Sequence, residues 1–257
     1  MEVADRFARL VAGDASIPVD EGALLIAAHL DADIDPTHER GRLDQLATTV
    51  REPTLDGVRR RLFDELGFTG DRTTYYDPRN SLLPAVLDRR RGIPISLAVI
   101  TMAVARRVSV PLDGVGMPGH FLLRDRVDRE VFIDPFAAGI ELDRAGCRAR
   151  FHEIQGPDAP FDPDWLEPVP ARAVLARMLG NLRAIFARSG DRTRLGRVLH
   201  LVTLLPDTGE DEARQLAAVL VAQGQFDKAA AVHDRLAEVG GDDRDRARAA
   251  SLRARLN

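Results

Sequence analysis

The segment from Ile95 to Val108 constrains the fold more than any other stretch, because it is almost wholly apolar as far as Arg106. Gly92 and Pro94 precede this segment, and proline is well suited to the first turn of a helix. A helix that is apolar on nearly every side has to be buried on most sides. The sequence therefore predicts a buried helix in the middle of a globular fold.

Composition describes an ordinary globular protein. The chain has 257 residues, 45% of them hydrophobic and 30% charged, which is enough for one large domain or two smaller ones. Its net charge of −4 provides no basic field for nucleic acid. The 35 arginines stand against a single lysine, Lys228, a skew that is typical of GC-rich bacterial coding and not of phosphate binding.

The termini and the apolar runs indicate a cytoplasmic protein without a membrane partner. The N-terminal residues are charged and contain no apolar signal core. No window approaches the roughly 20 apolar residues that span a bilayer. A single cysteine, Cys147, excludes an intrachain disulfide.

Apolar spacing predicts an α+β fold in three parts. Residues 1–70 contain four helical patterns, and Asp20 is the expected N-cap of the second. Residues 71–160 form a core in which Ser81 is expected to cap a short helix and two short strands, separated by a charged turn, form an antiparallel hairpin. Residues 172–257 are helical throughout, after a segment with five prolines between residues 151 and 171.

The C-terminal part contains a trace of a repeat. Val202, Pro206 and Ala213 recur as Leu236, Gly240 and Ala247 at an offset of 34 residues. This spacing is typical of paired helices in a short helical-repeat array.

The hairpin carries the residues that could perform chemistry. His120 begins the first expected strand and Asp134 ends the second, so strand pairing brings imidazole and carboxylate to one edge. A carboxylate on one ring nitrogen fixes the tautomer and leaves the other nitrogen as a base. Two plainer interpretations remain: His120 as a structural histidine, and Asp134 as a turn residue before Pro135.

At this point the sequence resembles a known family. The stretches YYDPRNSLLPAVLDRRRGIPISL, GVGMPGHFLLR and IDPF resemble the transglutaminase-like domain of the bacterial SirB-one family over roughly residues 35–145. The helical C-terminal part resembles the tetratricopeptide-like helices of that family. The resemblance implies a transglutaminase/papain-like core with a small antiparallel sheet.

The resemblance also implies a triad, of which one member is missing here. His120 and Asp134 match the histidine and aspartate of the superfamily. The catalytic cysteine of the superfamily lies two residues after a glycine at a helix start, and counting from Gly92 this position is Pro94. Cys147 lies outside every motif and is interpreted as a buried or incidental thiol.

Several other polar residues are candidates for the same site. Ser96 is the only hydroxyl near the helix start, either as a substitute nucleophile or as a partner of a free backbone amide. Arg79 and Asn80 are candidate ligand-binding groups, as a carboxylate clamp and an amide donor, although their turn is also suited to capping. Tyr75 is expected at the rim, and Gly119 would let backbone or substrate come close.

Two functions follow. The first is a noncatalytic binding or regulatory module, with a cleft for a peptide or acyl ligand and helices that bind a protein partner. The second is an acyl hydrolase or amide transferase in which His120 is the general base, Asp134 orients it, and Ser96 or water attacks.

Other classes have less support. A metal site would need more than His120 and Asp134, and the remaining histidines lack metal-ligand spacing. We therefore expect no metal and no cofactor. Arginines are spread among nearly equal numbers of acids, which argues against nucleic acid, and no feature of the sequence specifies an oligomeric state.

Overall fold

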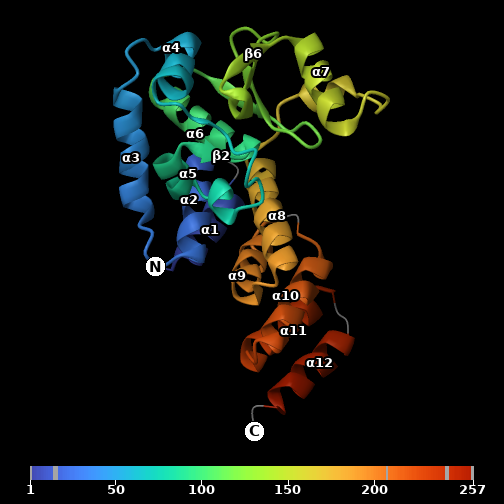
Figure 1. The fold of residues 1–257 in the computed structure, drawn as a ribbon. Coiled ribbons are helices and arrows are strands. Elements are labelled where there is room, and N and C mark those ends of the chain that lie inside the picture. Colours follow the sequence, from blue (N-terminus) through green and yellow to red (C-terminus); the bar gives the residue numbers. More distant parts are fainter. Residues whose placement is uncertain (1, 14–16, 207, 241–242, 256–257) are drawn as a thin grey trace. The chain divides into compact units, whose positions relative to one another are not determined.

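The computed structural model describes residues 2–13, 17–206, 208–240 and 243–255. The chain divides into two compact units, one formed by Ala15–Met178 and the other by Met1–Asp14 together with Leu179–Asn257. Each unit is described by itself (Figure 1). Within the described residues, no helix is both long and apolar enough to cross a membrane.

The larger unit combines helices with a small sheet. Its helices and helical turns are α2 (Val19–Leu30), α3 (Pro36–Thr48), α4 (Leu55–Arg59), the π-helical η1 (Arg60–Glu65), the 3-10 turn η2 (Pro78–Ser81), α5 (Leu83–Arg89), α6 (Pro94–Arg107), the 3-10 turn η3 (Pro135–Ala137), α7 (Arg144–Gln155), the 3-10 turn η4 (Pro163–Leu166) and the first part of α8 (Ala171–Ser189). This architecture confirms the expected α+β class.

The strands form two sheets. A four-stranded antiparallel sheet has the order β3 (Leu112–Val115), β4 (Leu122–Asp125), β5 (Phe132–Asp134) and β6 (Ile140–Leu142). The expected hairpin is its centre, with Leu123 opposite Ile133 and Arg124 opposite Phe132. A short parallel pair joins β1 (Thr69–Gly70) to β2 (Arg91–Gly92).

Helix α6 is the buried centre of the larger unit, as its apolar sequence predicts. Eleven of its residues are buried, from Pro94 at the first turn to Ala105. It contacts α2, α3 and α5 as well as β3, β4 and η3. Because η3 directly follows the end of β5, this packing sets the end of the hairpin against the central helix.

Two expected caps differ from the structure. The residue preceding α2 is Pro18, and Asp20 lies in the first turn, where its buried carboxylate pairs with Arg106 and Arg107. The helix expected from Ser81 begins instead at Leu83, because Asp77 caps the 3-10 turn η2 ahead of it. At Asp20 the ion pairs with two arginines replace the capping role that the local sequence suggests.

The smaller unit is helical. It contains α1 (Val3–Ala12), the later part of α8, α9 (Arg192–Val202), α10 (Glu210–Ala222), α11 (Phe226–Gly240) and α12 (Asp243–Arg253). Helices α9 to α12 pack in chain order, each against the next, and α1 contacts α9. Between α10 and α11 the chain turns at Gly224, whose φ of +73° suits glycine.

The expected three-part division places a boundary at residue 70. In the structure, helices α2 to α4 before this residue and the sheet after it lie in the same compact unit. The first helix, α1, groups with the C-terminal helices instead. Residues far apart in the sequence thus share a core in each unit.

Two glycines with left-handed backbone make a matched stability test. Gly67 and Gly139 have φ of +73° and +70°, but a Cβ at Gly67 would meet nothing within 4 Å, whereas one at Gly139 would lie 2.0 Å from the ring of Phe63. We expect Gly67→Ala to cost about 1–2 kcal/mol from backbone strain alone. Gly139→Ala should cost about 1–3 kcal/mol more, because Phe63 must move. Equal losses in urea unfolding would contradict this reading.

Candidate functional site

His120 and Asp134 meet at one edge of the sheet. His120 closes a tight turn, its amide donating to Met117 O at 3.0 Å, and precedes β4, while Asp134 ends β5. The register of these two strands brings the side chains together, with His120 Nε2 lying 2.9 Å from Asp134 Oδ1. Both side chains are buried.

The Asp134 carboxylate is compensated on both oxygens. The amides of Phe136 and Ala137 donate to Oδ1 at 3.0 and 3.2 Å, and Arg150 Nε lies 3.0 Å from Oδ2. Burial alone would raise the pKa of Asp134, but His120, Arg150 and the amides outweigh it, so this pKa lies below its usual value. Asp134 is therefore an anion at neutral pH.

One nitrogen of His120 remains available. The carboxylate at Nε2 favours the tautomer that carries its proton there. The other nitrogen, Nδ1, has no hydrogen-bond partner among the described residues. A ring held in this way presents Nδ1 as a base or hydrogen-bond acceptor.

Aromatic rings line the histidine. Phe136 meets His120 edge-on, with ring centroids 5.9 Å apart, and meets Tyr75 in the same manner at 5.9 Å. Phe136 can lie here because β1 has a glycine beneath it: a Cβ at Gly70 would lie 2.4 Å from the ring. The structure thus brings Tyr75 into the surroundings of His120, as the sequence predicts.

Two arginines at the site were not identified from the sequence. Arg150 comes from α7 and holds Asp134. Arg177 comes from α8, and its Nη2 donates to the carbonyls of Met117 and His120 at 3.0 and 2.8 Å. Burial lowers the pKa of Arg177. No local motif marks either residue among 35 arginines.

Ser96 has a structural role. Its side chain is fully buried, and Oγ accepts from the amide of Ile93 at 3.1 Å and donates to Asn80 O at 2.6 Å. The hydroxyl is buried and its proton is engaged, which argues against the interpretation of Ser96 as a nucleophile. The alternative interpretation, a partner for a free amide in the first turn, is confirmed.

Asn80 also belongs to the scaffold. Its side-chain amide donates to Thr74 O at 2.7 Å and accepts from Arg89 Nη1 at 2.8 Å, and the residue is fully buried. Arg89 in turn reaches Asp71 at 3.1 Å, whose pKa is lowered mainly by hydrogen bonds from Thr74. Asn80 therefore holds the 71–80 loop, and its bonds within the core argue against the prediction that it donates to a ligand.

Arg79 and Gly119 find partners close by. Arg79 is exposed and pairs with Asp77 of its own turn at 2.6 Å. Gly119 has a φ of +75°, and a Cβ there would lie 2.4 Å from Gln155 Nε2. The close approach at Gly119 is thus to α7, and a contact of either residue with a ligand stays a prediction.

The position that the resemblance assigns to a nucleophile is a helix start in the structure. Pro94 is the first residue of α6 and is buried. Cys147 lies in the core of α7 and the sheet, packed with Phe132 and Phe151, and burial raises the pKa of its thiol to about 12. The thiol is therefore neither reactive nor exposed at neutral pH.

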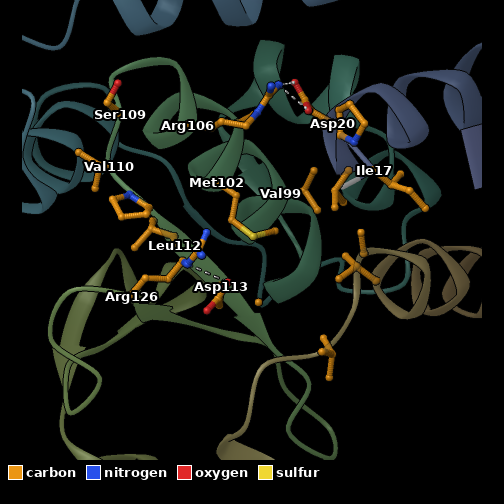
Figure 2. A pocket seen from close by; sticks show the side chains of 18 residues that line it. Ile17, Asp20, Val99, Met102, Arg106, Ser109, Val110, Leu112, Asp113 and Arg126 are labelled. Carbon is orange, nitrogen blue, oxygen red and sulfur yellow. Dashed lines mark hydrogen bonds and ion pairs between the residues drawn. The ribbon is translucent and has the colours of Figure 1, made fainter. Parts of the chain in front are cut away.

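A pocket elsewhere in the larger unit is separate from the His120–Asp134 pair. No group of three metal-ligating side chains occurs within the part of the chain that the structure describes. A pocket of about 380 Å³ lies by the C-terminal half of α6, where Val99, Met102 and Leu112 line it (Figure 2). Its rim charges pair with each other, Asp20 with Arg106 and Asp113 with Arg126. Neither His120 nor Asp134 lines it.

The fold and the His–Asp pair define a transglutaminase-like protein. The family model of the transglutaminase-like superfamily matches residues 25–180, and the chain belongs to this family. No solved structure matches the chain.

The similar proteins include bacterial and animal chains. A UPF0162 protein of Xylella fastidiosa is 40% identical over 215 residues, 77% of this chain and 76% of that protein. A UPF0162 protein of Pseudomonas aeruginosa is 37% identical over 182 residues, 66% of each chain. F-box only protein 21 of Homo sapiens is 33% identical over 150 residues, 55% of this chain and 23% of that protein.

Replacing Ser96 tests its structural role. Ser96→Ala leaves the buried Ile93 amide without its partner and should lower the free energy of unfolding by about 1–3 kcal/mol. Thr101→Ala is the matched control, because the Thr101 hydroxyl is equally buried but only donates to Leu97 O within α6. It should cost less in the same urea titration. Labelling of Ser96 by a fluorophosphonate would contradict the assignment.

Asp134→Asn tests the charge balance at acid pH. The pKa of Asp134 is lower in the folded state than in the unfolded state, where it is about 3.9. The ionised carboxylate therefore contributes its full stabilisation above the unfolded-state pKa, and this contribution is lost as the pH falls through the folded-state pKa. The variant should be less stable at pH 7 and should lose less stability than wild type between about pH 5 and 3. Asp113→Asn, at a loose 3.8 Å surface pair, is the control. Parallel pH profiles would refute the claim.

Proposed function

We propose that this protein is a noncatalytic transglutaminase-like binding module. It uses the surroundings of His120 to hold a peptide or small acyl ligand, and its C-terminal helices to bind a protein partner. One observation carries the proposal: the His120–Asp134 pair is complete and buried, while the nucleophile position is a helix-starting proline.

Covalent catalysis lacks a nucleophile here. Pro94 has no reactive group, the Ser96 hydroxyl is bound within the core, and the Cys147 thiol is buried with its pKa raised to about 12. The Ser96 hydroxyl and the Cys147 thiol could attack an acyl group only if the core of the larger unit opened.

The site has features suited to reversible binding. His120 Nδ1 can exchange hydrogen bonds with an amide, and Phe136 and Tyr75 provide an aromatic wall for apolar atoms. The Asp134 anion keeps the ring in one orientation and one tautomer. Such a site is organised before the ligand arrives, which reduces the entropic cost of binding.

The C-terminal helices are assigned the partner-binding role. Their 34-residue offset and the turn at Gly224 support a short tetratricopeptide-like array. The resemblance to the SirB-one family adds a regulatory role to this proposal.

Water-mediated hydrolysis is the second candidate. It is favoured by the unpartnered Nδ1 of His120, which could remove a proton from water beside a bound acyl group. Asp134 would stabilise the imidazolium that forms. In this case the protein would be a slow hydrolase without a covalent intermediate.

Two probes separate the candidates. We expect acetyl-tetraalanine amide at millimolar concentration to shift the His120 ring signals in NMR spectra, and we expect no hydrolysis of acetyl-alanine p-nitrophenyl ester above background. His120→Ala should abolish peptide binding. His233→Ala is the matched control, because His233 lies 2.7 Å from a buried aspartate, Asp245, in the other unit.

The outcomes are distinct. Ester hydrolysis that is lost in His120→Ala but kept in His233→Ala would establish the hydrolase and overturn the binding module. Peptide binding that persists in His120→Ala would show that the peptide does not bind at His120.

A further inference from the structure

Arg177 is an unusual cation in the larger unit. It comes from α8, lies over the ring of Phe121 at 5.6 Å, and uses Nη2 to hold two carbonyls of the turn that carries His120. No carboxylate of the described residues pairs with it. Its remaining donors, on Nε and Nη1, have no partner in the described part of the chain.

Arg124 on the sheet has the same two kinds of contact as Arg177 and, in addition, a carboxylate partner. Arg124 also stacks on a phenylalanine, Phe132, and also binds a backbone carbonyl, that of Arg129. Arg124 additionally has a carboxylate, Glu167, at 3.0 Å. Partly buried charges are normally compensated, so the absence of an acid at Arg177 leaves a place for an external anion.

Tyr75 supplies a second donor in the surroundings of His120, which it reaches through the ring of Phe136. Its ring is held edge-on against Phe136, and its hydroxyl has no hydrogen-bond partner among the described residues. The guanidinium of Arg177 lies close enough to act on the phenol electrostatically, but burial outweighs this and raises the pKa of Tyr75. The hydroxyl therefore carries its proton at neutral pH.

We propose that Arg177 and Tyr75 form a carboxylate-binding subsite next to His120. The inference rests on the proposed function and names the ligand class: a peptide or acyl compound that carries a carboxylate. Arg177 would donate a charge-assisted hydrogen bond to the carboxylate from one of its free donors, Nη1 or Nε, and the Tyr75 hydroxyl would add a second hydrogen bond.

The charges nearby favour this assignment. The anion of Asp134 is already compensated by Arg150 and two amides, so it leaves the charge of Arg177 uncancelled. Arg177 binds the carbonyl of His120 itself at 2.8 Å, so a carboxylate on Arg177 would lie beside the same turn as the imidazole. One guanidinium and one hydroxyl match the single charge of a carboxylate.

Three peptides test the subsite by isothermal titration calorimetry: acetyl-tetraalanine as the free acid, its C-terminal amide, and acetyl-Ala-Glu-Ala amide. We expect one of the two carboxylate peptides to bind at least about tenfold more tightly than the amide. The free acid would identify a C-terminal carboxylate, and the glutamate peptide an acidic side chain.

Variants assign the preference to the two residues. Tyr75→Phe keeps the packing on Phe136. It should weaken the binding of the preferred peptide about threefold to tenfold and leave the affinity for the amide peptide unchanged. Arg177→Gln should bind the preferred peptide no better than the amide. Arg124→Gln, which loses a comparable ring and carbonyl contact, should retain the preference.

The failures are separable. Equal binding of all three peptides to the wild type, or a preference that survives both Tyr75→Phe and Arg177→Gln, overturns the subsite and leaves the proposed function in place. Binding of none of them overturns both.

Discussion

The burial of helix α6 is the constraint on which the larger unit depends. A buried helix start needs partners for its free amides, and Ser96 supplies one while its hydroxyl also holds the carbonyl of Asn80. Through Asn80 and Arg89, the same connection reaches the loop that begins at Asp71. Since η3 and β4 pack on α6, the position of the histidine–aspartate pair follows from this helix. The polar residues at the helix start are therefore part of its packing.

The buried charges of Asp134 and Arg177 differ in how fully they are compensated. Asp134 is a buried anion with every oxygen occupied, which makes it an orienting group for His120 and nothing more. Arg177 is a partly buried cation whose compensation is incomplete. A protein of this family can thus have an ordered imidazole while its helix start carries proline. The unpaired charge of Arg177 favours a role in binding.

Local patterns predicted the parts of the structure that local physics controls. The apolar run of α6, the hairpin and the pairing of His120 with Asp134 follow from periodicity and from strand geometry. Strands β3 and β6 were not predicted, because each is defined by its pairing with a strand of the hairpin and not by a local pattern of its own. Arg150 and Arg177 were not predicted either, because each acts across a contact between segments distant in sequence, and an arginine in a helix has no local signature of its partner.

The sequence by itself determined the class of fold, the buried helix and the proline two residues after Gly92, because all three depend on residue type and spacing. Only the tertiary structure decided which polar residues are available. Ser96 and Asn80 were taken into the core by hydrogen bonds to backbone, while Tyr75 was brought towards His120 by the ring of Phe136. The physical reason is that a side chain is available only if folding leaves its donors and acceptors unpaired, and pairing is decided by contacts between distant segments.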